Sequence, residues 1–427
     1  MLTALVVVFV IAYAAIALEH ALKINKSASA LIGAGLLWTI YAMATADHHV
    51  VSHQLGESLL ATAQIIFFLM GAMTIVEVID AHNGFEVITK RIRTQQLSTL
   101  MWLVSFVTFF LSALLDNLTT TIVMVSLMRK LLSHRADRLF FAGIIVIAAN
   151  SGGAWSPIGD VTTTMLWIGG QITAMGIITS VFVPSVVSLL VPLSITAYVL
   201  RGRPVISPEH VDSDHGLKTS VFESKAMLFL GLGILVAVPA FKTITHLPPY
   251  LGILFGLGIL WLVGDLIHRR KEDEYKNHLT LAHALSRIDM SSLVFFIGIL
   301  LAVATLEHTH ILSALALWLD QTLGRLDIIV LVIGLVSAVV DNVPLVAASM
   351  GMNDLSKYPT DHFLWHFLAY AAGTGGSILI IGSAAGVAAM GLEKIDFFWY
   401  VRKISGLALI GYLAGAGTYL LQYQLIH

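Results

Sequence analysis

The fold of this chain is decided by residues 112–117, SALLDN, in which an Asp-Asn pair interrupts a strongly apolar run. A second copy of the phrase, SAVVDN, occupies residues 337–342. Each copy is followed, at nearly equal spacing, by an apolar run that Gly-Gly interrupts, at residues 152–153 and 375–376. A carboxylate inside a hydrophobic span is a functional residue by default, because inserting it into lipid costs at least about 2.5 kcal/mol. Matching sites in two halves predict a transporter built from repeats.

Composition places the chain in a membrane. Of its 427 residues, 57% are hydrophobic and 12% are charged, whereas a soluble domain carries about 25% charged residues. Apolar runs of about 20 residues recur along the whole length, which predicts an all-α polytopic membrane protein. The formal net charge of −2 gives no indication of nucleic-acid binding, and the lack of cysteine excludes disulfides and thiolate chemistry. The apolar N-terminus is expected to be a retained first helix.

Basic residues predict the orientation of the spans. If residues 98–133 form a re-entrant helical hairpin, the basic clusters all fall on one side of the membrane. These clusters lie at residues 23–26, 90–93, 129–138 and 394–403. By the positive-inside rule this side is the cytoplasm. The segment 47–58 is then an external polar loop, and a second hairpin, 327–352, opens the opposite way. Two oppositely oriented hairpins predict inverted-topology repeats.

Charge alone does not establish re-entrance, because two full crossings would give the same orientation. Re-entrance is inferred from the polar tips, Asp116-Asn117 and Asp341-Asn342, since irregular backbone at membrane depth persists only inside protein or beside water. The expected organisation comprises N-terminal transmembrane helices (1–58), a first repeat (59–200), a cytoplasmic linker (201–225), connecting helices with a cytoplasmic loop (226–290) and a second repeat (291–427).

Two further spans are expected to be discontinuous helices. Residues 150–160 combine Asn, Ser, Gly-Gly and Pro with a final Asp, and residues 373–383 repeat the pattern with Gly, Thr and Ser. Glycine and proline release the helical hydrogen-bond ladder, so freed backbone groups can face an ion or substrate. The two hairpin tips and the two helix breaks are therefore expected to converge.

The four interruptions contain oxygen and amide side chains and no Arg, Lys or His. Such groups suit a hard cation, and a carboxylate that holds a proton does not readily hold a metal ion. This competition is the physical basis of proton–cation exchange. The candidate cation ligands are Asp116, Asn117, Asn150, Asp160, Thr162, Thr163, Asp341, Asn342, Thr374 and Ser377.

Alternative interpretations remain for these residues. Ser, Thr and Asn in membrane helices also bond neighbouring helices, and Gly also permits close helix approach. This interpretation is weakest for Asp116 and Asp341, which recur at matching positions, whereas Asp160 has no acidic counterpart in the second half. The sequence contains no His-Glu-x-x-His motif and no nucleophile constellation that would indicate an enzyme. No resident cofactor is expected.

At these motifs the sequence resembles the NhaD-type sodium/proton antiporters, a branch of the ion transporter superfamily. The resemblance is carried by residues 112–120, 150–164, 337–344 and 373–386. It implies a homodimer with a scaffold part and a moving transport part in the bacterial inner membrane. It also implies export of Na⁺, often Li⁺, against inward protons, for sodium and pH homeostasis.

The same superfamily includes divalent-anion/sodium symporters, whose hairpin tips carry Ser-Asn-Thr. Here Asp stands in the place of that Ser at both tips, and the second tip, Asp341-Asn342-Val343-Pro344, lacks the Thr. Both departures favour cation exchange. Two rival functions stay open from the sequence, namely a Na⁺-coupled symporter of a small organic or inorganic anion, and a membrane subunit or channel without coupled exchange.

Overall fold

A computed structural model describes residues 1–17, 19–89, 94–206, 219–269 and 279–426. All regular elements in these residues are helices, and the only strand-like pairing among them is an isolated bridge between Gln96 and Pro204. Eight described helices are long and apolar enough to cross a membrane. The prediction of an all-α polytopic membrane protein is therefore confirmed.

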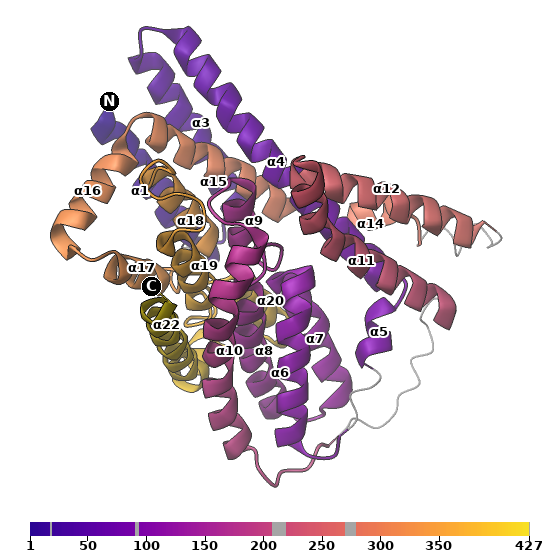
Figure 1. Cartoon of the computed structure of the whole chain (residues 1–427). Coiled ribbons are helices and arrows are strands. Elements are labelled where there is room, and N and C mark those ends of the chain that lie inside the picture. The colour runs from indigo at the N-terminus through magenta and orange to yellow at the C-terminus, as the bar shows by residue number, and fades with distance from the viewer. Residues whose placement is uncertain (18, 90–93, 207–218, 270–278, 427) are drawn as a thin grey trace.

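One set of helices forms the outer group, which spreads across the top and right of Figure 1. It comprises α1 (Leu2–Ala17), α3 (Lys26–Ala44), α4 (His48–Ala81), α11 (Val221–Thr245), α12 (Pro249–His268) and α15 (Met290–His308). Within it, α3 packs on α1 and α15, and α4 packs on α12 and α15. Short helices α2 (Glu19–Leu22), α5 (Gly84–Thr89) and α14 (Leu281–Arg287) accompany these helices.

A second set, the inner group, carries the interrupted spans. Its first half comprises α6 (Leu97–Leu115), α7 (Asn117–Leu131), α8 (Arg135–Ala154), α9 (Val161–Ile168) and α10 (Ala174–Val199). Its second half comprises α17 (Leu326–Val336), α18 (Asn342–Met352), α19 (Phe363–Gly375), α20 (Ala384–Glu393) and α22 (Gly406–Ile426). The peripheral α16 (Ile311–Leu323) lies at the left of Figure 1, and α21 (Phe397–Tyr400) and η1 (Val401–Ser405) lead into α22.

Both halves of the inner group follow the same order of elements. A helical hairpin (α6–α7, α17–α18) is followed by two helices separated by a break (α8–α9, α19–α20) and then by a long helix (α10, α22). The halves interlock, because α7 packs on α20, α9 packs on α18 and α10 packs on α22. The opposite orientation of the two halves in the bilayer stays a prediction.

The expectation of an external polar loop over residues 47–58 is wrong. Asp47 caps the first turn of α4 by accepting the backbone N–H groups of His49 and Val50, and the helix then runs without interruption to Ala81. At 1.5 Å per residue, these 34 residues span about 50 Å, more than the roughly 30 Å hydrocarbon core. The polar residues that suggested a loop form a helical extension beyond the apolar part of α4.

Candidate functional site

The repeated Asp-Asn pairs form the tips of the two hairpins. Asp116 separates α6 from α7 and caps α7, since its Oδ1 accepts the backbone N–H of Thr119 at 2.7 Å and its Oδ2 accepts the Thr119 hydroxyl at 2.8 Å. Asp341 caps α18 by accepting the backbone N–H of Val343 at 3.2 Å. An aspartate is a preferred N-cap because it satisfies an N–H group that has no partner within the helix.

The first tip is also strained. Asp116 has φ of 134° and ψ of 163°, a backbone region that is essentially restricted to glycine and costs of the order of 1–3 kcal/mol. Asp341, at the second tip, has φ of −47° and ψ of 135°. The two tips therefore share the Asp-Asn sequence but not the backbone conformation of the aspartate.

The two helix breaks are built in the same way as the tips. Asp160 caps α9, with its Oδ1 accepting the backbone N–H and the hydroxyl of Thr162, each at 2.9 Å. Ser383 caps α20 by accepting the backbone N–H of Gly386 at 3.2 Å. Four helices thus begin at the interruptions, and three of their four caps are carboxylates.

Glycines let each broken helix approach the first helix of its hairpin. A Cβ on Gly152 would overlap the carbonyl oxygen of Phe109, and a Cβ on Gly375 would overlap that of Gly334. Hydroxyls lock the same contacts, since Ser112 donates to the carbonyl of Ala149 at 2.6 Å and Ser337 donates to that of Ala372 at 2.8 Å. Matching glycines and serines therefore seat tip and break together in both halves.

Asp160 is the point at which the two hairpins meet. Asn117 Nδ2, from the first tip, donates to Asp160 Oδ2 at 2.7 Å. Asn342 Nδ2, from the second tip, lies 3.3 Å from Oδ2 and 3.4 Å from Oδ1 of the same carboxylate. All three side chains are buried, with Asp160 only 2% exposed. One carboxylate in the first break thus collects a donor from each hairpin tip.

Asn150 links the first half of the site to the second. Its side-chain oxygen accepts from Asn117 Nδ2 at 3.0 Å, and its Nδ2 donates to the hydroxyls of Ser377 and Ser383 at 2.9 Å each. Asn150 is fully buried and the two serines are nearly so. The network therefore runs from the first tip through the first break to the second break.

The remaining expected ligands lie at the edge of this network. The Thr163 hydroxyl donates to the carbonyl of Asp160 at 2.9 Å, and the Thr374 hydroxyl donates to the carbonyl of Tyr370 at 2.6 Å, so each bonds its own segment. Asp116 bonds the helix that it caps, whereas Asp341 bonds both the helix that it caps and a residue of α3. Each of the two aspartates lies next to an asparagine that reaches Asp160.

Sequence analysis missed one charged residue at the site, Lys26. Its Nζ lies 3.0 Å from Asp341 Oδ2. Charge patterning predicts a cytoplasmic loop at Lys26, whereas the residue is the first of α3, which follows the N-cap Asn25. The signal in the sequence is Asn25, a preferred N-cap residue, directly before Lys26 and a run rich in Ser, Ala and Gly. The four interruptions themselves contain no Arg, Lys or His, and Lys26 reaches the second tip from α3.

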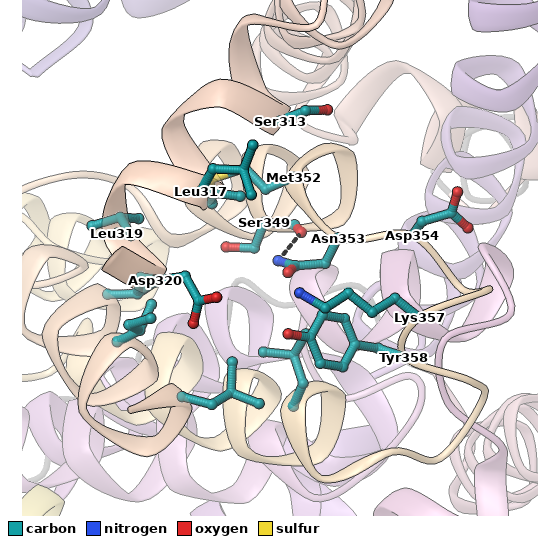
Figure 2. A pocket seen from close by; sticks show the side chains of 15 residues that line it. Ser313, Leu317, Leu319, Asp320, Ser349, Met352, Asn353, Asp354, Lys357 and Tyr358 are labelled. Atoms are coloured by element: carbon teal, nitrogen blue, oxygen red, sulfur yellow. Dashed lines mark hydrogen bonds between the residues drawn. The ribbon is translucent and has the colours of Figure 1, made fainter. Parts of the chain in front are cut away.

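A cavity of about 270 Å³ lies away from this network, between α16, α17, α18 and the chain that leads into α19. Figure 2 shows Asp320, Lys357 and Tyr358 beside it, with Asn353 donating to the carbonyl of Ser349. Its lining contains none of the expected cation ligands. The expected cation ligands therefore lie outside this cavity, in the network described above.

A protein-family model described as "Citrate transporter" matches residues 8–373. The chain belongs to this family. Among its relatives, Sodium/proton antiporter 1 of Arabidopsis thaliana is 49% identical over 99% of this chain and 73% of the relative. The Na(+)/H(+) antiporter NhaD of Vibrio cholerae is 31% identical over 98% of this chain and 91% of the relative. The resemblance to NhaD-type proteins is thereby confirmed.

Among solved structures, the YdaH transporter of Alcanivorax borkumensis shares the fold. The TM-score is 0.60 at 13% sequence identity, and the match covers 89% of this chain and 90% of the other. At this identity the likeness concerns the fold alone. Family membership and fold agree with a membrane transporter.

Proposed function

We propose that this protein is a secondary transporter that exchanges cytoplasmic Na⁺, or Li⁺, for external protons. The observation that carries the proposal is the buried carboxylate of Asp160, which accepts Asn117 from one hairpin tip and Asn342 from the other. The names of relatives at 49% and 31% identity, both sodium/proton antiporters, support the same activity. The exchange occurs at a binding site and involves no covalent chemistry.

The charge of Asp160 explains why Na⁺ and a proton exclude each other. A buried carboxylate requires a compensating positive charge or proton. Either a proton or a metal cation supplies it, and the first to bind reduces the attraction for the second. The amides of Asn117 and Asn342 donate to Asp160 through their nitrogens, so either residue can ligate a cation only after it turns its oxygen inwards. Cation ligation and the present network are thus alternative states of the same side chains.

The ligands proposed for the cation are the oxygens around this carboxylate. Asp160 and Thr162 come from the first break, Asn150 extends the site towards Ser377, and Asp116 and Asp341 stand behind the two asparagines. Thr163 and Thr374 are proposed to support these ligands without contacting the cation, since their hydroxyls donate to backbone carbonyls. Oxygen-only ligation of this kind suits Na⁺ and Li⁺.

Transport of an anion with Na⁺ is the second candidate, because the family model is described as a citrate transporter. Helix N-termini favour anions, and four helices begin at the site. Three of these N-termini are capped by aspartates, however, and the Lys26 ammonium is paired with Asp341. A carboxylate substrate would face three acids, so cation exchange fits the site better.

We also propose the setting in which the exchanger works. The halves 59–200 and 291–427 are proposed as inverted repeats, supported by their matching order of helices. The protein is proposed to be a homodimer in a bacterial inner membrane, as the resemblance implies. Light scattering of the detergent-solubilised protein tests whether it is a dimer. Fractionation of the source cell tests in which membrane the protein resides.

The proposed function is tested with purified protein in proteoliposomes that contain a pH-sensitive dye. Addition of Na⁺ to one side should move protons in the opposite direction, and choline should not. Labelled citrate is offered in parallel to the same vesicles. Citrate uptake driven by Na⁺, without proton counterflow, would contradict the proposal and support the anion symporter. Dissipation of the Na⁺ gradient without proton movement would indicate a channel.

A further inference from the structure

Lys26 joins the outer group to the second hairpin tip. Its Nζ donates to Asp341 Oδ2 at 3.0 Å, and the side chains of the two residues are 23% and 15% exposed. The ammonium also lies 4.6 Å from the centre of the Phe295 ring on α15, which holds it by a cation–π contact. Lys26 belongs to α3 and Asp341 to the start of α18, so the pair bridges two separate sets of helices.

Among the residues that the structure describes, no lysine or arginine pairs with Asp116 at the first tip. Asp116 is held by the hydroxyl and backbone N–H of Thr119 within its own hairpin. At the second tip, Pro344 occupies the position that corresponds to Thr119, so Asp341 lacks that hydroxyl. The Lys26 ammonium takes the place of the missing donor and brings a full positive charge. The two tips of the repeat are therefore chemically different.

A second lysine offers a direct comparison. Lys242, on α11, also reaches from the outer to the inner group, with its Nζ 2.7 Å from the carbonyl oxygen of Trp167 and 4.7 Å from the centre of its ring. Its described contacts are with the C-terminal part of α9, and none of them is with Asp116, Asp160 or Asp341. Like Lys26, Lys242 bridges the outer and inner groups, but its partner is a backbone carbonyl and not a carboxylate.

We propose that Lys26 is a tethered counter-ion that occupies Asp341 while no Na⁺ is bound there, and so sets the affinity of the exchanger for Na⁺. The proposal rests on the proposed function, because it assumes that Asp341 helps to bind the transported cation. A carboxylate held by an ammonium at 3.0 Å can ligate Na⁺ only after that ammonium is displaced. Lys26 and Na⁺ are alternative partners of one carboxylate, and Lys26 acts as a positioning residue.

The first test compares transport kinetics of Lys26→Met, Lys26→Arg and Lys242→Met in proteoliposomes at alkaline pH, where few protons compete. Lys26→Met should lower the KM for Na⁺ about threefold or more, which corresponds to at least about 0.65 kcal/mol of lost competition. Lys26→Arg retains the charge and should keep the wild-type KM. Lys242→Met should also keep it. An unchanged or raised KM in folded Lys26→Met overturns the proposal.

The second test uses the wild-type chain, so it does not depend on whether a variant folds. An amine-reactive reagent is applied with Na⁺ or with choline, and labelling of each lysine is measured by mass spectrometry. Na⁺ should increase labelling of Lys26 and leave Lys242 unchanged. Equal labelling of Lys26 in both salts overturns the proposal. Failure of the proposed function itself would be seen separately, as wild-type protein without Na⁺-dependent proton flux.

Discussion

Asn117 donates from Nδ2 to Oδ2 of Asp160 at 2.7 Å, although the two residues belong to different interruptions of the membrane-spanning helices. Asn342 reaches the same carboxylate from the second half of the chain. The acids that recur in the repeat, Asp116 and Asp341, stand one residue away from these asparagines. The centre of the site is therefore the acid that does not recur.

Replacement of this acid should abolish exchange. In Asp160→Asn the side chain carries no charge for a proton or Na⁺ to neutralise, so Na⁺-driven proton flux should fall by about a hundredfold or more, equivalent to at least about 2.7 kcal/mol. Asp160→Glu should retain a measurable part of the flux. Asp265→Asn, at an exposed position on α12, is the matched control. Substantial flux in folded Asp160→Asn would refute the assignment.

Loss of Asn150 should weaken both the fold and cation binding. Asn150→Ala removes the amide that bonds Asn117, Ser377 and Ser383, and an unsatisfied buried polar group costs about 1–3 kcal/mol. The expected result is a lower Tm of the solubilised protein and a higher KM for Na⁺. Asn353→Ala, which removes a single bond to a backbone carbonyl beside the cavity, should leave KM unchanged. An equal KM for Na⁺ in both variants would show that Asn150 does not belong to the cation site.

Much of this site was predictable from sequence, because its chemistry follows from local pattern. An Asp-Asn pair within an apolar run, and Gly-Gly within the next one, fixed the positions of two tips and two breaks. The central place of Asp160 was not predictable, because it depends on how the two halves interlock. Lys26 was missed for a similar reason, since charge patterning assigns it to a loop and only packing of α3 brings it to Asp341.

The glycines at the helix breaks should not tolerate a methyl group. In Gly152→Ala and Gly375→Ala the new Cβ would meet a backbone carbonyl oxygen, and forced overpacking typically costs about 1–3 kcal/mol. Gly391→Ala is the matched control, because its Cβ would meet nothing within 4 Å. Thermal unfolding should show a lower Tm for the first two variants alone. A wild-type Tm for both variants would mean that the helix breaks do not pack closely against the neighbouring backbone carbonyls.

Protonation of His362 should destabilise the protein at low pH. Burial lowers the pKa of His362, and its Nδ1 accepts the backbone N–H of Leu364 at 3.1 Å as the N-cap of α19. The unfolded chain therefore binds this proton more readily, so the contribution is complete above the ordinary pKa of about 6.5 and is lost as the pH falls below it. His362→Asn keeps an acceptor without titrating, so its Tm should fall less between about pH 8 and about pH 5. Parallel decreases in both proteins would exclude this role.

The central claim is that Na⁺ and a proton exclude each other at Asp160. The most direct measurement is the number of protons released when Na⁺ is added to purified protein in a weakly buffered detergent solution, with choline as the control. The account predicts that Na⁺ releases protons from the wild-type protein and that Asp160→Asn releases markedly fewer. Na⁺ binding to the wild type without proton release, or equal release by the variant, would contradict it.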